Sequence, residues 1–191
     1  VFTTTGEVNV SGNMLSLLYG DNFTEYDKCT SANYVFSWFF SGSNIIDASN
    51  LYVLYGVGYG TFYRFFSDST KLKYPPKILH CDPTGKILNG AMYVAGFCNC
   101  SSLIAVPELP ATTLKVNCYG YMFKGCTSLT EAPELPATTL EFGCYSYMFN
   151  NCTNLVNAPK LPATILAGSC YHTMFSGCSN LTAAPELPAT T

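Results

Sequence analysis

Apolar side chains recur in adjacent pairs along residues 118–126, separated by pairs of small or polar positions. They are Cys118, Tyr119, Met122, Phe123 and Cys126. Residues spaced i, i+4 and i+8 share one face of an α-helix. The pattern therefore predicts a short amphipathic helix, which Gly125 ends because glycine tolerates a left-handed backbone.

Residues 129–132 alternate between apolar and polar side chains, and this alternation predicts a brief β-strand. Pro133 and Pro136 follow, and a proline supplies no N–H to a strand ladder, so the strand should be short. A strand, a turn and a helix would together make one coil of chain.

The same unit recurs with a fixed 26-residue period. Its copies begin at Pro107, Pro133, Pro159 and Pro185. The first full copy matches the second at 17 of 26 positions, and the second matches the third at 14. A period of this length is typical of repeats that stack on one another and bury a shared core.

Stacked coils would place their strands about 4.8 Å apart in a parallel sheet, whereas neighbouring helices need about 8–10 Å between their axes. This difference would bend the stack. We therefore predict an α/β repeat fold, a curved solenoid with short parallel strands on its concave side and short helices on its convex side.

Weaker copies of the unit lie upstream of residue 107. Phe66 lies one repeat period after Phe40, whereas Phe97 lies more than one period after Phe66, which indicates an insertion near residues 77–90. We predict an N-terminal cap or lead-in (1–30) and six coils behind it, which comprise divergent repeats with the insertion (31–106) and regular repeats (107–191). The last region stops inside a repeat, so we expect a fragment of a longer protein.

The inward positions of the regular units form the expected core ladder. It comprises Cys100, Cys118, Met122, Phe123, Cys126, Leu129, Cys144, Met148, Phe149, Cys152, Leu155, Cys170, Met174, Phe175, Cys178 and Leu181. Two cysteines eight positions apart on a helix are separated by about 12 Å, too far for a disulfide. Buried free thiols are thus favoured over disulfides or a metal site. The candidates for an exception are the cysteines that do not occupy a repeated position of the unit, Cys29, Cys81 and Cys98.

The composition excludes several classes of partner. Charged residues make up 11% of the chain and the net charge is −3, without a basic stripe for nucleic acid. Apolar runs are too short to enter a membrane as a spanning helix. We expect no cofactor and no metal.

Catalytic residues are scarce. His172 occupies a variable, outward position, and His80 lies next to Cys81 without an evident group to orient the pair. We therefore predict that the chain is not an enzyme. A carbohydrate-active enzyme would need a catalytic domain elsewhere or a carboxylate pair in the insertion.

One charge pattern suggests a binding surface on the strand side. Equivalent positions of successive units carry Lys77, Glu108, Glu134, Lys160 and Glu186, so Lys160 could pair with both flanking carboxylates. Together with Thr130 and Glu131 they form the predicted binding strip. A solvated edge is the favoured interpretation of the charge pattern, because exposed ion pairs contribute about 0–1 kcal/mol.

Aromatic residues make up 15% of the chain and crowd its first third. Most are expected in the core, because large rings bury well. A platform for stacking sugars is the alternative for a few of them.

The motif Met-Phe-x-x-Cys-x-x-Leu occurs at 122–129, 148–155 and 174–181, with a Pro-Glu-Leu-Pro-Ala-Thr-Thr-Leu spacer. This combination resembles the 26-residue subtype of the BspA-like leucine-rich repeat, known from surface proteins of Bacteroides-type gut bacteria. Residues 6–23 are similar to the lead-in that often precedes such repeats.

The resemblance implies a non-enzymatic extracellular module at the bacterial cell surface, which binds host or bacterial proteins or glycans. Two alternatives remain: a structural spacer that displays another domain, or a receptor-binding or fibre component of a phage. A spacer would lack an outward cluster of Tyr, Trp or Arg, the residues enriched at binding hot spots.

Overall fold

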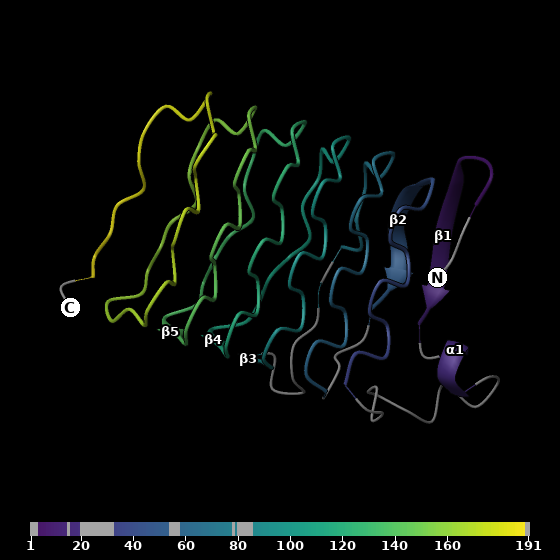
Figure 1. Cartoon of the computed structure of the whole chain (residues 1–191), viewed down its shortest axis with the longest axis horizontal. Helices are drawn as coiled ribbons and strands as arrows, with labels where there is room; N and C mark the ends of the chain where they lie inside the picture. The colour runs from purple at the N-terminus through teal and green to yellow at the C-terminus, as the bar shows by residue number, and fades with distance from the viewer. Residues whose placement is uncertain are drawn as a thin grey trace.

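The chain winds in successive coils that lie side by side along the long axis of the molecule (Figure 1). The computed structural model describes residues 4–14, 16–19, 33–53, 58–77, 79 and 86–189. Within these ranges, residues one repeat apart are neighbours in space, as the hydrogen bonds and ring contacts below establish.

Two small parallel sheets join the coils. The strands are β1 (Val8–Asn13), β2 (Ile45–Tyr52), β3 (Ile87–Leu88), β4 (Thr113–Leu114) and β5 (Thr139–Leu140). β1 pairs with β2, and the other three form a sheet in the order β3-β4-β5. Leu88, Leu114 and Leu140 lie opposite one another in this sheet and are all buried.

The strand expected at residues 129–132 is not present. β4 and β5 instead lie directly before the segments predicted to be helices. A single backbone hydrogen bond, from Val156 N to Thr130 O (3.1 Å), reaches this stretch from the next coil. Pro133 and Pro136 have no N–H to extend the pairing further.

The helices expected at residues 118–126 and their equivalents are also absent. Among the described residues the only α-helix is α1 (Ser16–Tyr19). In place of the expected helices are six runs of consecutive tight turns, here called the turn segments. They span residues 33–42, 59–68, 90–99, 116–125, 142–151 and 168–177.

Hydrogen bonds between coils replace the helical ones. Tyr119 N donates to Cys144 O in the next coil (3.0 Å), and Tyr121 N donates to Ser146 O (2.8 Å). The residues between them bond locally, as in the donation from Met122 N to Tyr119 O (3.2 Å). Every second N–H is thus committed to the neighbouring coil, so the local i to i−4 pattern of an α-helix cannot form.

The turn segments repeat every four residues. Asn117, Tyr121 and Gly125 have positive φ values of 57°, 59° and 74°. The left-handed conformation expected at Gly125 is confirmed, although it does not end a helix. A four-residue repeat also brings apolar side chains inward in pairs, which is why the sequence pattern resembles that of a helix.

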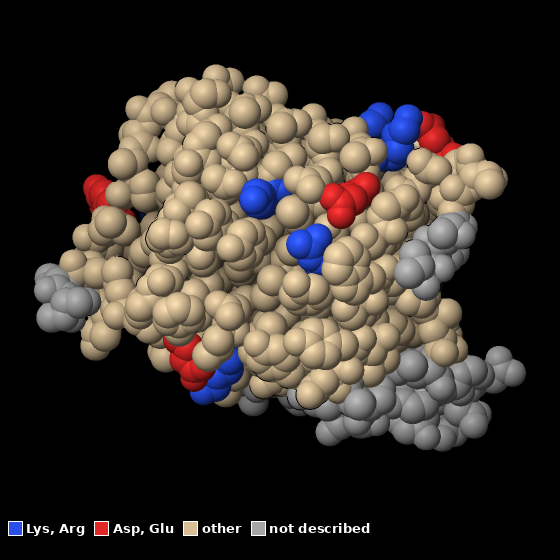
Figure 2. All heavy atoms as spheres, in the orientation of Figure 1, with Lys and Arg blue, Asp and Glu red and all other residues tan. Residues whose placement is uncertain are grey.

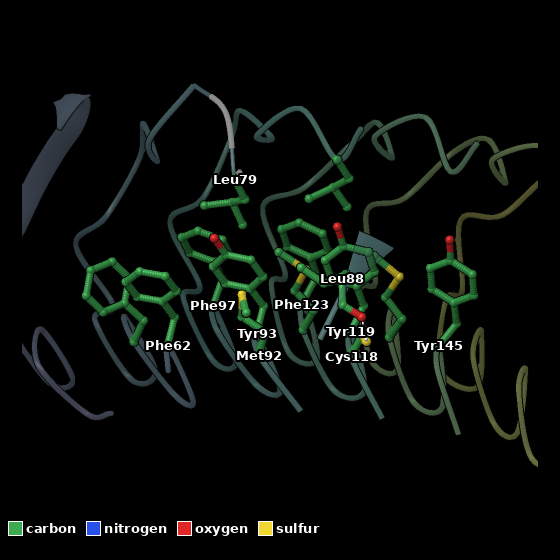
Figure 3. Packing of buried hydrophobic residues seen from close by; sticks show 14 of the residues in the cluster. Phe62, Leu79, Leu88, Met92, Tyr93, Phe97, Cys118, Tyr119, Phe123 and Tyr145 are labelled. Atoms are coloured by element: carbon green, nitrogen blue, oxygen red, sulfur yellow. Dashed lines mark hydrogen bonds between the residues drawn. The ribbon is translucent and has the colours of Figure 1, made fainter. Parts of the chain in front are cut away.

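Two columns of aromatic rings run through the core (Figure 3). One contains Phe36, Phe62, Tyr93, Tyr119, Tyr145 and Tyr171, and the other Phe40, Phe66, Phe97, Phe123, Phe149 and Phe175. Phe97 and Phe123 stack at 5.7 Å with an interplanar angle of 6°. Phe66 stacks on Phe97 at 5.6 Å, so the predicted alignment of these two rings across the insertion is confirmed.

A column of thiols donates hydrogen bonds across the coils. Cys126 Sγ lies 3.1 Å from Phe97 O, one coil back, and the other cysteines of its column make the same contact. Ser69 takes the equivalent position earlier in the chain, and its hydroxyl donates to Phe40 O (2.7 Å). The described cysteines are all free thiols: Cys98, Cys100, Cys118, Cys126, Cys144, Cys152, Cys170 and Cys178.

Burial keeps these thiols protonated. Desolvation is the largest influence on Cys144 and Cys152, and it raises the pKa of each to about 12. The neighbouring cysteines Cys170 and Cys178 add a smaller upward shift to these two pKa values. The folded protein therefore holds protons at high pH that the unfolded chain would release.

Replacing Ser169 by glycine should raise the free energy of unfolding by about 1 kcal/mol, because Ser169 is exposed and has a φ of 59°. The matched control is Ser176→Gly. Ser176 is also exposed but is not among the residues with positive φ, so glycine should be destabilising there. Urea unfolding measures both changes, and equal effects would contradict the left-handed turn geometry.

Stability should fall as the pH rises above about 9, the ordinary pKa of a cysteine thiol. Each thiol that stays protonated only in the folded state removes about 1.4 kcal/mol per pH unit between its unfolded and folded pKa. Urea unfolding of the wild type and Cys152→Ser from pH 7.5 to 10.5 tests this, since serine keeps a donor but does not titrate. Parallel pH profiles for the two proteins would refute it.

Candidate functional site

The predicted binding strip lies on exposed, extended stretches of successive coils. Its members Lys77, Glu108, Thr130, Glu131, Glu134, Lys160 and Glu186 are all exposed. Glu108 is tied to Lys77 through the backbone, its N–H donating to Lys77 O at 2.7 Å. Buried leucines at 109, 135 and 161 alternate with the outward positions and anchor these stretches to the core.

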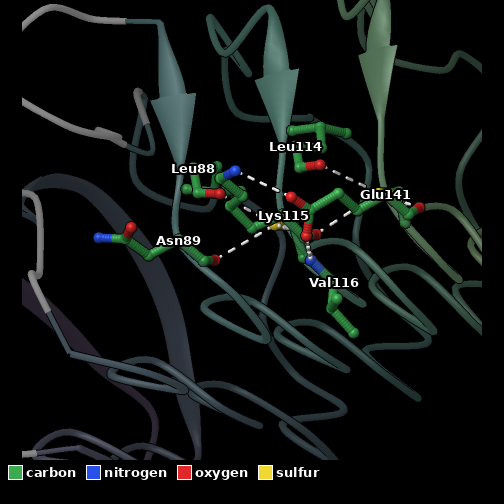
Figure 4. Close-up of polar contacts among 8 residues, drawn as sticks. Leu88, Asn89, Leu114, Lys115, Val116 and Glu141 are labelled. Carbon is green, nitrogen blue, oxygen red and sulfur yellow. Dashed lines mark hydrogen bonds and ion pairs between the residues drawn. The ribbon is translucent and has the colours of Figure 1, made fainter.

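The prediction of an ion-pair ladder along this strip is wrong. In the part of the chain that the structure describes, two ion pairs occur, Lys71–Glu7 (3.4 Å) and Lys115–Glu141 (2.8 Å). Lys115 and Glu141 directly follow β4 and β5 (Figure 4), and neither belongs to the predicted binding strip. The carboxylate of Glu141 also accepts a hydrogen bond from Val116 N (3.1 Å), which helps to fix it there.

Open grooves separate the coils where the prolines occur. One of about 390 Å³ is lined by Glu108 and Glu134, and one of about 690 Å³ by Lys160 and Glu186. Among the described residues no backbone hydrogen bond joins 131–137 to 157–163. Missing proline donors explain both the grooves and the failure of the charges to meet, so these grooves reflect the packing of the coils.

The expected core ladder occupies the interior. Its members up to residue 174 are buried, whereas Phe175, Cys178 and Leu181 are half-buried. Cys98, outside the two cysteine columns, is a buried free thiol whose pKa is raised mainly by desolvation. Cys29, Cys81 and His80 lie outside the described residues.

A second surface, not singled out by the sequence, runs across all six turn segments. It is a trough of about 410 Å³, here called the aromatic trough. The rings along it belong to Tyr34, Tyr59, Tyr63, Tyr121, Phe142 and His172. Small residues such as Ala91, Gly120 and Gly143 form its floor, so the trough is open because the side chains between the rings are short.

Three of these rings lie over a glycine of the next coil. Tyr59 covers Gly90, where a Cβ atom would come within 2.8 Å of the ring, and Phe142 covers Gly168 at 3.4 Å. Tyr34 covers the third glycine, at position 60. Because a glycine has no side chain, each of these rings can lie against the backbone of the next coil.

These rings are exposed for side chains of their size. Tyr34 is 47% exposed, Tyr59 41% and Phe142 55%. Tyr34 and Tyr59 are therefore at the surface, whereas Phe36, Phe40 and the other rings of the two columns are in the core, as expected for most of the aromatic residues. In the sequence, a glycine lies one repeat after each of these three rings. The interpretation of the segments as helices hid the significance of this spacing.

Cations flank the trough and rest on aromatic faces. The Arg64 guanidinium lies 4.7 Å from the Trp38 ring centre, and Lys124 Nζ lies 5.6 Å from that of Tyr121. Partial burial raises the pKa of Tyr121, and the adjacent Tyr147 adds to the rise. These charged groups lie beside the trough, and no Lys, Arg, Asp or Glu of the described chain lines it.

His172 does not form a catalytic pair. Its Nε2 lies 3.2 Å from the hydroxyl of Tyr147, and the two rings meet edge to face at 5.2 Å. Both groups are at the surface, and the described part of the chain brings no carboxylate to the imidazole to orient it as a base. The contact is suited to hold two rings in place at one end of the trough.

Figure 2 shows a face of the molecule on which charged side chains are few. No group of three or more metal-ligating side chains occurs among the described residues. No helix in the described ranges is long and apolar enough to cross a bilayer. The arrangement offers aromatic faces, hydroxyls and amides for contact with a partner.

Comparison of the chain with protein-family models, with curated proteins and with solved structures found no match in any of the three.

Proposed function

We propose that this chain is a leucine-rich-repeat-type solenoid that acts, without catalysis, as an extracellular recognition module at a bacterial surface. The motif Met-Phe-x-x-Cys-x-x-Leu supports the family, and the stacking of equivalent rings in successive units supports the repeat architecture. The aromatic trough is the proposed contact surface.

The observation that carries the proposal is the outward cluster of Tyr34, Trp38, Tyr59, Tyr63 and Arg64 in the first two turn segments. Tyr34 lies edge to face with both Tyr59 and Tyr63 at 5.9 Å, so the rings hold one another in position. Tyr, Trp and Arg are enriched at binding hot spots, where rigid rings lose little entropy on contact. A structural spacer would have no use for such a cluster in solvent.

The spacing of the coils supports recognition over catalysis. Each coil contributes only a few side chains to the trough, and neighbouring coils are held at strand distance by their backbone bonds. The result is a long, shallow surface, which is typical of the binding faces of repeat proteins. A reaction would need water-excluded groups converging on one atom.

Replacing Trp38 and Tyr59 together by alanine should weaken attachment of the labelled protein to its target surface at least tenfold. Hot-spot rings typically contribute about 2 kcal/mol or more each. Flow cytometry on epithelial and bacterial cells, together with an array of extracellular-matrix proteins and glycans, measures the attachment.

The matched control is Glu134→Gln with Lys160→Gln, which alters the proline-flanked strip and leaves the trough intact. It should bind as the wild type does, and urea unfolding should show both variants folded. Equal binding by the trough variant and the control, or no attachment of the wild type to any of these targets, would favour a structural spacer.

A further inference from the structure

We propose that the aromatic trough binds an extended, uncharged polysaccharide chain lying along the stack of coils. The inference rests on the proposed recognition function and specifies the chemical class of the ligand. Four features support it: the length of the trough, the exposure of its rings, the uncharged side chains that line it and the hydrogen-bonded backbone beneath it.

The trough fits a chain and is too long for a single sugar. It extends from Tyr34 in the first turn segment to Ser169 and His172 in the sixth. Five steps between hydrogen-bonded coils, at about 4.8 Å each, give a length of about 24 Å. A linear polymer can therefore contact several coils at once.

The rings are exposed to solvent. Tyr34, Tyr59 and Phe142 each pack against a glycine of the next coil, and 47%, 41% and 55% of these side chains remain exposed. The face of an aromatic ring carries the negative end of its quadrupole. It therefore attracts the weakly positive C–H groups that project from the flat side of a sugar ring.

The polar groups between the rings are neutral donors and acceptors. Asn117, Ser146 and Ser169 line the trough, and no carboxylate, lysine or arginine of the described chain lines it. Such groups match the hydroxyls of a neutral sugar, whereas a strongly acidic polymer would need cations within the trough. Arg64 and Lys124 are held beside it on aromatic rings.

The backbone below the trough cannot pair with a peptide strand. From Asn117 to Cys126 each N–H already donates to another backbone carbonyl, alternately in the next coil and three residues back. A peptide added as a strand depends on free main-chain donors and acceptors. A proline-rich peptide on the rings is the remaining alternative, and the experiment below separates it from a polysaccharide.

The test is affinity gel electrophoresis of the full chain in gels that contain a soluble glucan, mannan, xylan or galactan. We expect at least one polymer to retard the wild type, and oligosaccharides of that polymer to compete more strongly as they lengthen. Tyr59→Ala should raise the dissociation constant at least tenfold, whereas Tyr59→Phe, which keeps the ring, should stay within twofold.

Gly90→Ala provides an independent variant, because a methyl group there would meet the Tyr59 ring at 2.8 Å and displace it without removing it. It should weaken retardation at least threefold, while Lys160→Gln on the other surface should leave it unchanged. Circular dichroism and urea unfolding verify that each variant is folded.

Three outcomes would overturn the inference: no retardation by any of the four polymers, retardation that Tyr59→Ala leaves unchanged, or binding of a proline-rich decapeptide in place of the polymers. Trough-dependent attachment to a protein target without polysaccharide binding would overturn the ligand class and leave the recognition function standing. Polysaccharide binding through the trough without attachment to any cell would support the ligand class and overturn the recognition function at a bacterial surface.

Discussion

The hydrogen bonds between turn segments are the constraint on which the rest of the structure depends. Every second N–H in a segment donates to a carbonyl one repeat further along, as Tyr119 does to Cys144, and the others close tight turns. This division satisfies the backbone inside the protein without a helix or a long strand. It also holds successive coils at a constant spacing and in strict register.

The register explains the composition of the core. Because equivalent side chains meet directly, a flat ring stacks on the same ring of the next coil, and Phe97, Phe123 and Phe149 repeat with nearly parallel planes. Cysteine also suits this register, because its side chain is small enough to be buried and its thiol can donate a weak hydrogen bond. Ser69 makes the equivalent bond earlier in the stack, so the position requires a small donor more than it requires sulfur.

The same register creates the surface proposed for recognition. Gly90 and Gly168 let Tyr59 and Phe142 lie against the neighbouring coil, and short side chains between the rings leave the trough open. On the proline-flanked side no backbone hydrogen bond of the described chain joins residues 131–137 to 157–163, and Lys160 and Glu134 form no ion pair. Backbone pairing thus decides which outward side chains gather into a continuous surface.

The sequence by itself determined the 26-residue period, the alignment of Phe66 with Phe97 across the insertion, the identity of the core columns and the left-handed position at Gly125. These follow from the spacing of side chains, which stacking preserves. The tertiary structure decided between a helix and a turn segment, placed the strands at Thr113–Leu114 and Thr139–Leu140, and brought the rings of the trough together. In so short a segment, the spacing of apolar side chains cannot distinguish a period of 4 residues from one of about 3.6. The backbone N–H groups that decide between the two structures donate to the next coil, and the local sequence does not reveal that partner.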